Sequence, residues 1–143
     1  MTRIDFYVLP SHDPHVRRVT ACKLVEKAFR QGHTVYLKTD NEAESRMFDD
    51  LLWTFRQGSF VPHELAGLPE SEAPVIIGHL PPPEGMRDVM VNLGQDVPEG
   101  YAAFERLAEL VDQDESTRSA GRRRYRQYQL DGHAVQTHQL DRT

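Results

Sequence analysis

Arginine and tyrosine side chains recur near the end of the chain at spacings that fit one face of a helix. Arg118, Arg122 and Tyr125 are four and three residues apart, so on a helix they lie along one side. A guanidinium beside an aromatic ring can bind a carboxylate that carries an apolar group, and neighbouring arginines attract further acidic residues. A solvated terminal helix covered with arginines would contain the same residues, and the pattern alone leaves both interpretations open.

A second group of chemically distinctive residues lies in the middle of the chain. Trp53 is followed by Phe60-Val-Pro-His63 and then by Leu65-Ala-Gly67. Large apolar side chains outside the regular core mark protein interfaces. The alternative is that Trp53 and Phe60 fold back and anchor their own loop, and the residue types do not decide between the two.

Several familiar reaction centres are absent from the sequence. The predicted first strand–helix turn, Leu9–Pro14, contains no glycine, and neither a Walker loop nor a Gly-x-Gly-x-x-Gly motif occurs. These absences argue against ATP hydrolysis and dinucleotide binding in the usual mode. The seven histidines form no ligand pattern with carboxylates or cysteine, so we expect no metal and no cofactor. Asp49-Asp50 is interpreted as surface charge, Cys22 as a core thiol, and no catalytic residue is expected.

Length and composition indicate one globular domain over residues 1–143. The chain is 38% hydrophobic and 27% charged, which is close to the average of soluble domains. The single Cys22 excludes an internal disulfide, and no apolar stretch approaches the length of a membrane span. We therefore expect a cytoplasmic protein that neither crosses nor binds a membrane.

The net charge of −5 combines two unequal parts. Residues 1–115 hold 11 basic and 20 acidic residues, a balance of −9, and residues 116–143 hold 6 and 2, a balance of +4. An acidic body is a poor general binder of nucleic acid, because affinity for phosphates needs positive surface charge. A local basic segment on such a body favours a small acidic partner.

Hydrophobic periodicity predicts a three-layer α/β domain with a mainly parallel sheet. The opening strand–helix–strand pattern predicts a βαβ unit whose two strands lie parallel and side by side. Residues 56–74 form a long connector, Pro81–Pro83 a stiff loop, and a polar tail follows Gly132. The C-terminal part of the predicted helix 101–111 could instead be a short strand, and Gly121 leaves open whether the last helix begins near it. The expected strands are 4–9, 34–38, 75–77 and 88–93, and the expected helices are 14–31, 41–53, 101–111 and 117–130.

The chain resembles the chi subunits of bacterial DNA polymerase III over nearly its whole length. The resemblance rests on Phe6-Tyr7-Val8-Leu9, on Leu52-Trp53 followed by Ser59-Phe-Val-Pro-His63 and Leu65-Ala-Gly67, and on Arg-x-Arg-Tyr-x-x-Tyr from Arg122 to Tyr128. It implies a Rossmann-like fold without a nucleotide site. It also implies a non-enzymatic adaptor that joins the clamp loader, through the psi subunit, to single-stranded DNA-binding protein, and so contacts nucleic acid only indirectly.

The resemblance also implies roles for individual residues. Val111, Arg122 and Tyr125 match the family's pocket for the acidic C-terminal tail of single-stranded DNA-binding protein, and Arg118 and Arg126 match its basic flanks. Trp53 and Phe60 match the surface used for psi and, in some relatives, for a helicase. The sequence departs from the family pattern at Gln129, where a basic residue is common, and at Gly121 inside the basic helix. Both departures are expected to weaken tail binding while leaving the central residues in place.

Two other function classes remain open at this point. The helix that carries Arg118 and Arg126 could bind nucleic acid directly, or the protein could act as a helicase-partner accessory protein in DNA repair; the acidic body argues against direct binding. A degenerate nucleotide enzyme is the third possibility, and the missing glycines argue against it.

Overall fold

Three helices begin at side chains that cap their first turns. The computed structural model describes residues 2–67 and 72–141. Asp13 caps α1 (Pro14–Arg30), Asn41 caps α2 (Glu42–Thr54) and Asp114 caps α3 (Glu115–Leu130). Each cap accepts a hydrogen bond from a backbone N–H that otherwise lacks a partner at a helix start. The capped start at Glu115 shows that Gly121 does not shorten the last helix.

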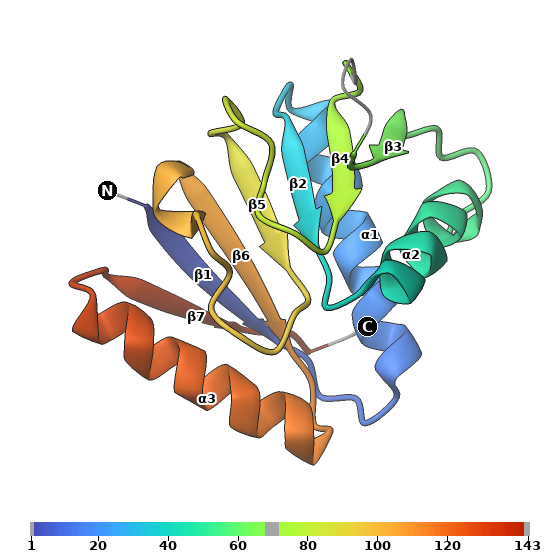
Figure 1. Cartoon of the computed structure of the whole chain (residues 1–143). Helices are drawn as coiled ribbons and strands as arrows, with labels where there is room; N and C mark the ends of the chain where they lie inside the picture. Colours follow the sequence, from blue (N-terminus) through green and yellow to red (C-terminus); the bar gives the residue numbers. More distant parts are fainter. Residues whose placement is uncertain (1, 68–71, 142–143) are drawn as a thin grey trace.

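Seven strands of the described chain form one sheet in which every neighbouring pair is parallel (Figure 1). Their order across the sheet is β3-β4-β2-β5-β6-β1-β7. A parallel sheet needs cover on both faces, because its strands are apolar on both sides. The strands are β1 (Arg3–Val8), β2 (Val35–Lys38), β3 (His63–Leu65), β4 (Val75–Gly78), β5 (Val89–Asn92), β6 (Arg106–Val111) and β7 (Val135–Gln139).

The helices lie on opposite faces of the sheet, which gives the predicted three layers (Figure 1). Alternate residues of a strand enter different hydrophobic clusters: Val35 and Leu37 pack on the side of α1 and α2, and Tyr36 packs on the side of α3. This arrangement confirms the α/β, Rossmann-like prediction. Within the described residues no helix is both long and apolar enough to span a membrane.

The prediction that the first two strands lie side by side is wrong. β5 and β6 lie between β1 and β2 in the sheet. The four residues of β5 are all buried, as are most of β6, whereas β1 turns Arg3 and Asp5 toward the α1 side. β5, which is buried along its whole length, lies at the centre of the sheet. α1 connects β1 to β2 and packs against β6, β5 and β2. β1 and β2 are three spacings apart, ~14 Å, and a helix of 17 residues is about 25 Å long, so α1 can span the distance.

The prediction that residues 101–111 form a helix is also wrong. The alternative, in which the C-terminal part of this segment is a strand, is correct. Only Tyr101–Ala103 form a short 3-10 helix, and Arg106–Val111 form β6 in the middle of the sheet. Phe104, Leu107 and Val111 have helical spacing in sequence, but a strand between β5 and β1 gains backbone hydrogen bonds on both edges. Tertiary pairing overrides the local period here.

Two more strands lie in segments that were predicted to be irregular. β3 lies inside the connector 56–74, of which residues 68–71 are outside the described residues. β7 lies in the polar tail after Gly132, and its sequence Val-Gln-Thr-His-Gln lacks the apolar pattern of a core strand. It takes an edge position beside β1, where polar residues are tolerated.

One arginine of the C-terminal run points into the protein. Arg124 is 2% exposed and forms an ion pair with the buried carboxylate of Glu109 on β6: its Nε donates a hydrogen bond to Oε2 at 3.1 Å, and its Nη2 lies 3.1 Å from Oε1. Asn92 and the hydroxyl of Tyr128 donate to the same carboxylate. Burial and the neighbouring Glu109 charge raise the pKa of Tyr128, so its hydroxyl stays protonated and remains a donor. The basic run is therefore not uniformly a surface feature.

We predict that Arg124→Ala lowers the free energy of unfolding by about 3–5 kcal/mol, because it leaves the Glu109 carboxylate buried without its cation. Arg123→Ala is the matched control, since Arg123 is its exposed neighbour on the same helix, and it should change stability by less than about 0.5 kcal/mol. Urea unfolding of both variants measures the difference. Equal, small effects would show that the pair does not hold α3 in place.

Candidate functional site

A hollow of about 340 Å³ opens between the N-terminal half of α3 and the carboxyl ends of three strands. Three predicted residues line it: Val111 at the end of β6, and Arg118 and Arg122 on α3. Apolar and cationic side chains are therefore combined in one place. The remaining lining residues are Phe6, Val8, Gln113, Gly121, Thr137 and Gln139.

The close approach of α3 to β6 depends on the absence of a side chain at Gly121. A Cβ atom at this buried position would lie 2.7 Å from Cγ2 of Val111, closer than carbon atoms pack. Gly121 lowers helix propensity by about 1 kcal/mol relative to alanine. The glycine that departs from the family pattern thus has a packing role directly beneath the hollow.

Arg118 and Arg122 form an exposed cationic rim above this apolar floor. Both side chains are exposed, and neither makes an ion pair within the part of the chain that the structure describes. Gln113 lies beside them and is fixed by two hydrogen bonds, from its side chain to the Leu9 carbonyl (2.8 Å) and from its backbone to the Ser11 carbonyl (2.9 Å). The two guanidinium groups are free to bind a carboxylate.

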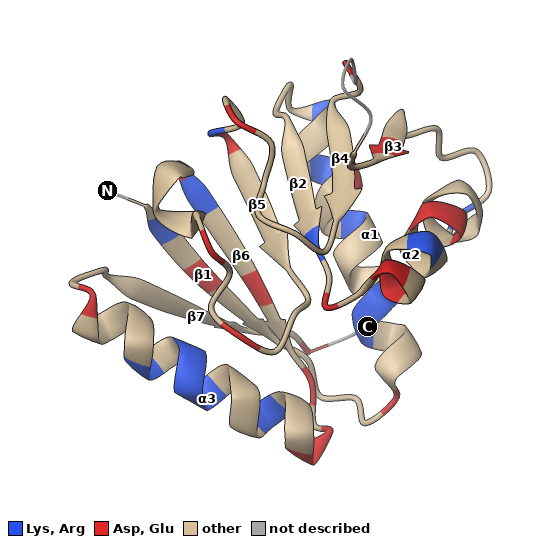
Figure 2. Ribbon diagram, viewed as in Figure 1, with Lys and Arg blue, Asp and Glu red and all other residues tan. Residues whose placement is uncertain are grey.

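Charges of opposite sign flank the rim (Figure 2). Arg126 follows toward the C-terminal end of α3 and is exposed. Asp114 and Glu115 lie at its N-terminal end, where a second, polar hollow is lined by them together with Arg118 and Arg122. An acidic ligand is therefore repelled at the start of the helix and attracted along its later turns.

The structure places Tyr125 and Arg126 outside the lining of the hollow. Tyr125 is partly buried and packs against Phe6, with ring centroids 5.2 Å apart, so it supports a wall that Phe6 presents. Arg126 lies beyond the rim and could act only at longer range. Thr137 and Gln139 were missed because β7 was not predicted, whereas the alternation of Phe6 and Val8 along β1 was a usable signal.

Trp53 and Phe60 are exposed, which supports the surface interpretation over the loop-anchor one. Phe60 is 77% exposed and Trp53 52%. The anchors of this loop are instead Val61, which is buried, and His63, whose ring nitrogens lie 2.6 Å and 2.9 Å from the carbonyl oxygens of Val61 and Asp49. The His63 ring also packs on Trp53, with centroids 4.4 Å apart.

A buried carboxylate holds the segment that leads to Phe60. Glu26 of α1 is 5% exposed and pairs with the guanidinium of Arg56 and with the hydroxyl of Ser59, and Arg30 adds a third contact at 3.7 Å. This network ties residues 56–59 to α1. The sequence offered no sign of it, because Glu26 lies 30 and 33 residues from these partners.

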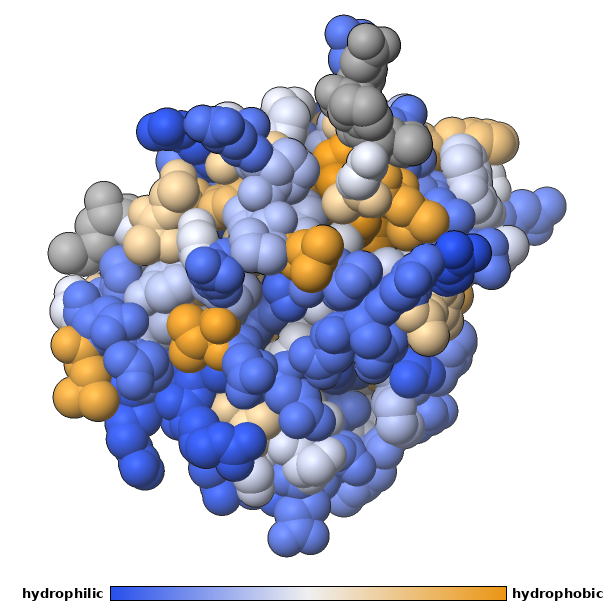
Figure 3. Space-filling model, viewed as in Figure 1, coloured by the Kyte–Doolittle hydropathy of each residue, from blue (hydrophilic) through white to orange (hydrophobic). Residues whose placement is uncertain are grey.

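An apolar hollow lies beside β3 and β4, at the edge of the sheet that the Phe60 segment leads into. The space-filling view shows apolar atoms gathered over β3 and β4 (Figure 3). The hollow there is lined mainly by Leu65, Ala66, Ile77, Leu80, Pro81 and Pro83. Sequence reasoning missed it, because its residues come from two strands and from the proline loop, which was interpreted only as stiff.

Within the described residues, Cys22, the metal-ligating side chains and the cleft at the strand ends bear on whether the chain holds a reaction centre. Burial raises the pKa of the Cys22 thiol to about 12, so it is not a reactive thiolate. No group of three or more His, Cys, Asp or Glu side chains in the described residues could hold a metal ion. The cleft at the carboxyl ends of the strands, where nucleotides bind in related folds, is lined by four carboxylates, Asp40, Glu44, Asp112 and Asp114, and by three arginines, Arg17, Arg18 and Arg124. The cations do not outnumber the carboxylates, so the lining has no excess of positive charge that would attract phosphate.

Comparisons with known proteins agree on one family. The family described as "DNA polymerase III chi subunit, HolC" matches residues 1–136. A Pseudomonas aeruginosa protein named DNA polymerase III subunit chi is 45% identical over 142 residues, with 99% of both chains covered. Proteins of the same name from Haemophilus influenzae and Escherichia coli are each 29% identical, covering 93% and 96% of this chain and 94% and 97% of their own.

We predict that Gly121→Ala lowers the free energy of unfolding by about 1–3 kcal/mol despite its better helix propensity, because the new methyl group overpacks against Val111. In a Val111→Ala background the same substitution should be neutral or stabilising, because the contact is relieved. Denaturant unfolding of the two single variants and the double variant measures the coupling. Additive effects would mean that the two residues do not press on each other.

Proposed function

Since this chain belongs to the DNA polymerase III chi subunit family, and so to DNA replication, we propose that it is a non-catalytic adaptor with two protein-binding surfaces. One surface binds the acidic C-terminal tail of single-stranded DNA-binding protein. The other binds the psi subunit of the clamp loader. The observation that carries the first assignment is the unpaired Arg118–Arg122 rim above the apolar floor of one hollow.

In this proposal each part of the tail contacts side chains of complementary charge or polarity. Arg122 binds the terminal carboxylate, because a guanidinium can make two parallel hydrogen bonds to it. The terminal phenylalanine lies on the floor formed by Val111, Phe6 and Val8, and Tyr125 supports Phe6 from behind. The preceding aspartates run toward the later turns of α3, away from Asp114 and Glu115, so that Arg126 attracts them at longer range.

Psi, or a helicase that uses the same surface, binds at the exposed pair Trp53 and Phe60. Trp53 lies in the last turn of α2, and Phe60 lies on the segment that follows this helix. Aromatic side chains are frequent hot spots of protein interfaces, because they bury a large area at a low cost in conformational entropy. The Glu26 network and His63 fix the loop before a partner arrives.

The direct nucleic-acid alternative is less well supported. The exposed arginines of the C-terminal run lie on one helix whose first turn is acidic, and the chain carries a net charge of −5. A nucleic-acid groove needs a continuous positive surface.

We predict that Arg122→Ala weakens binding of a tail peptide by about 2 kcal/mol or more, because it removes the partner of a partly desolvated carboxylate. Arg118→Ala and Arg126→Ala should cost less, and mainly at low salt, where screening is weak. Calorimetric titration at two salt concentrations separates these roles. The matched control is Arg123→Ala, an exposed arginine that does not line the hollow.

Two results would contradict this placement of the tail. One is wild-type affinity in Arg122→Ala. The other is undiminished affinity for a peptide that lacks its final phenylalanine.

For the second surface we predict that Phe60→Ala abolishes capture of psi while leaving the melting temperature unchanged, because a 77% exposed ring contributes little to the fold. Val61→Ala provides the contrast: its buried side chain should cost about 1–3 kcal/mol of stability. Thermal melts together with co-purification of co-expressed psi test both variants. Loss of stability in Phe60→Ala with psi binding intact would restore the loop-anchor interpretation.

A further inference from the structure

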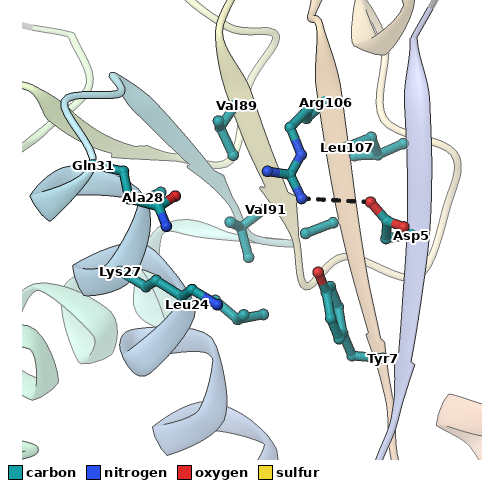
Figure 4. Close-up of a pocket in the computed structure, with 11 residues that line it drawn as sticks. Asp5, Tyr7, Leu24, Lys27, Ala28, Gln31, Val89, Val91, Arg106 and Leu107 are labelled. Carbon is teal, nitrogen blue, oxygen red and sulfur yellow. Dashed lines mark ion pairs between the residues drawn. The ribbon is translucent and has the colours of Figure 1, made fainter. Parts of the chain in front are cut away.

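We propose that the hollow between α1 and strands β1, β5 and β6 binds a small organic carboxylate (Figure 4). It has a volume of about 130 Å³ and lies on the opposite face of the sheet from α3. The proposal is independent of the adaptor function. The residues that carry it are Tyr7, Leu24, Lys27, Gln31, Val89, Val91, Arg106 and Ala108.

The floor of this hollow is apolar, and short side chains make the room for it. α1 packs against β2, β5 and β6. Ala28 on the helix and Ala108 on β6 both line the hollow and fill little of the space between the two layers. Val89 and Val91 of β5 close the bottom, and both belong to the hydrophobic core. An apolar group a few atoms in size would therefore be removed from water here.

The rim of the hollow carries excess positive charge. Lys27 and Arg106 contribute two cations and Asp5 one carboxylate, which leaves +1 on a chain whose total is −5. Asp5 already has close partners, at 3.1 Å from Arg3, 3.6 Å from Arg106 and 2.9 Å from His138. Lys27 makes no ion pair among the residues that the structure describes. The unbalanced charge selects an anion.

Hydrogen-bond donors surround the same space. Figure 4 shows the guanidinium of Arg106 and the hydroxyl of Tyr7 pointing into it from neighbouring strands, with Lys27 and Gln31 reaching it from α1. Burial raises the pKa of Tyr7, so its hydroxyl is a donor at neutral pH. A planar guanidinium beside an ammonium and a hydroxyl matches a carboxylate, which accepts several hydrogen bonds at once.

Size and surroundings argue for a carboxylate on a short branched group rather than for a phosphate ester. Phosphate sites use the N–H groups of a helix start or of a glycine-rich loop, and this hollow lies beside the last turns of α1. A volume of about 130 Å³ is also below the usual range of pockets for larger ligands, about 300–1,000 Å³. The carboxylate could belong to a free acid or to the carboxyl end of a peptide, and the chemistry is the same.

Titration of the full chain with isovalerate tests the proposal, with methyl signals of Val89, Val91 and Ala108 followed by NMR. We expect saturable shifts of these signals, no shifts with the neutral isostere isovaleramide, and none with inorganic phosphate at equal concentration. Acetyl-glycyl-leucine distinguishes the sources: shifts at lower concentration than isovalerate assign the site to a peptide end, and weaker or absent shifts assign it to a free acid.

Two substitutions test which side chains contribute to isovalerate binding. Arg106→Lys keeps the charge beside Asp5 but removes the paired donors, and it should weaken isovalerate about tenfold, the value of one charge-assisted hydrogen bond. Lys27→Gln should weaken it several-fold, whereas Lys23→Gln, exposed on the same helix but away from the hollow, should not. The proposal is overturned if isovalerate causes no saturable shift, if isovaleramide or phosphate shifts the signals equally, or if Arg106→Lys binds like the wild type.

Discussion

The buried ion pair between Glu109 and Arg124 determines how α3 lies on the sheet, and the proposed tail site depends on that orientation. α3 buries only Ala120, Gly121, Arg124 and Tyr128 among its sixteen residues, so little apolar surface is available to fix its rotation. Two of these four residues bond to the Glu109 carboxylate in the middle of the sheet. With Arg124 facing inward, Arg122 lies about 160° away around the helix and must face outward. A charge pair in the core thus places another arginine on the surface.

The sheet order separates the two proposed protein-binding surfaces. β3 and β7 are the opposite edges of seven strands, six spacings or about 29 Å apart. The loop that bears Phe60 leads into β3, and Thr137 and Gln139 of β7 line the hollow beneath α3. The surfaces also lie over different hydrophobic clusters, one on each face. An adaptor that must hold two partners at once needs such a separation, because neither partner then covers the other's site.

Sequence reasoning was reliable where one local signal was sufficient. Capping residues and apolar periodicity predicted all three long helices, and helical spacing placed Arg118 and Arg122 on one side of α3, where both line one hollow. Tyr125, the third residue of that pattern, lies outside this lining. It was wrong where the outcome depended on distant residues. Residues 106–111 have the period of a helix but form the sixth strand, because the sheet offers partners on both edges. In the sequence Arg124 cannot be distinguished from its exposed arginine neighbours, because its burial depends on a pair with Glu109, fifteen residues earlier.

The most direct test of the account is to determine where the terminal phenylalanine of the tail binds. Intermolecular NOEs between the ring protons of a labelled tail peptide and the methyl groups of the protein would locate it. The account predicts NOEs to Val111 and Val8, the aliphatic residues on the floor beneath Arg122. It would be contradicted by a bound peptide whose ring contacts Val89 and Val91 on the opposite face, or Leu65 and Ile77 beside β3, and gives no NOE to Val111.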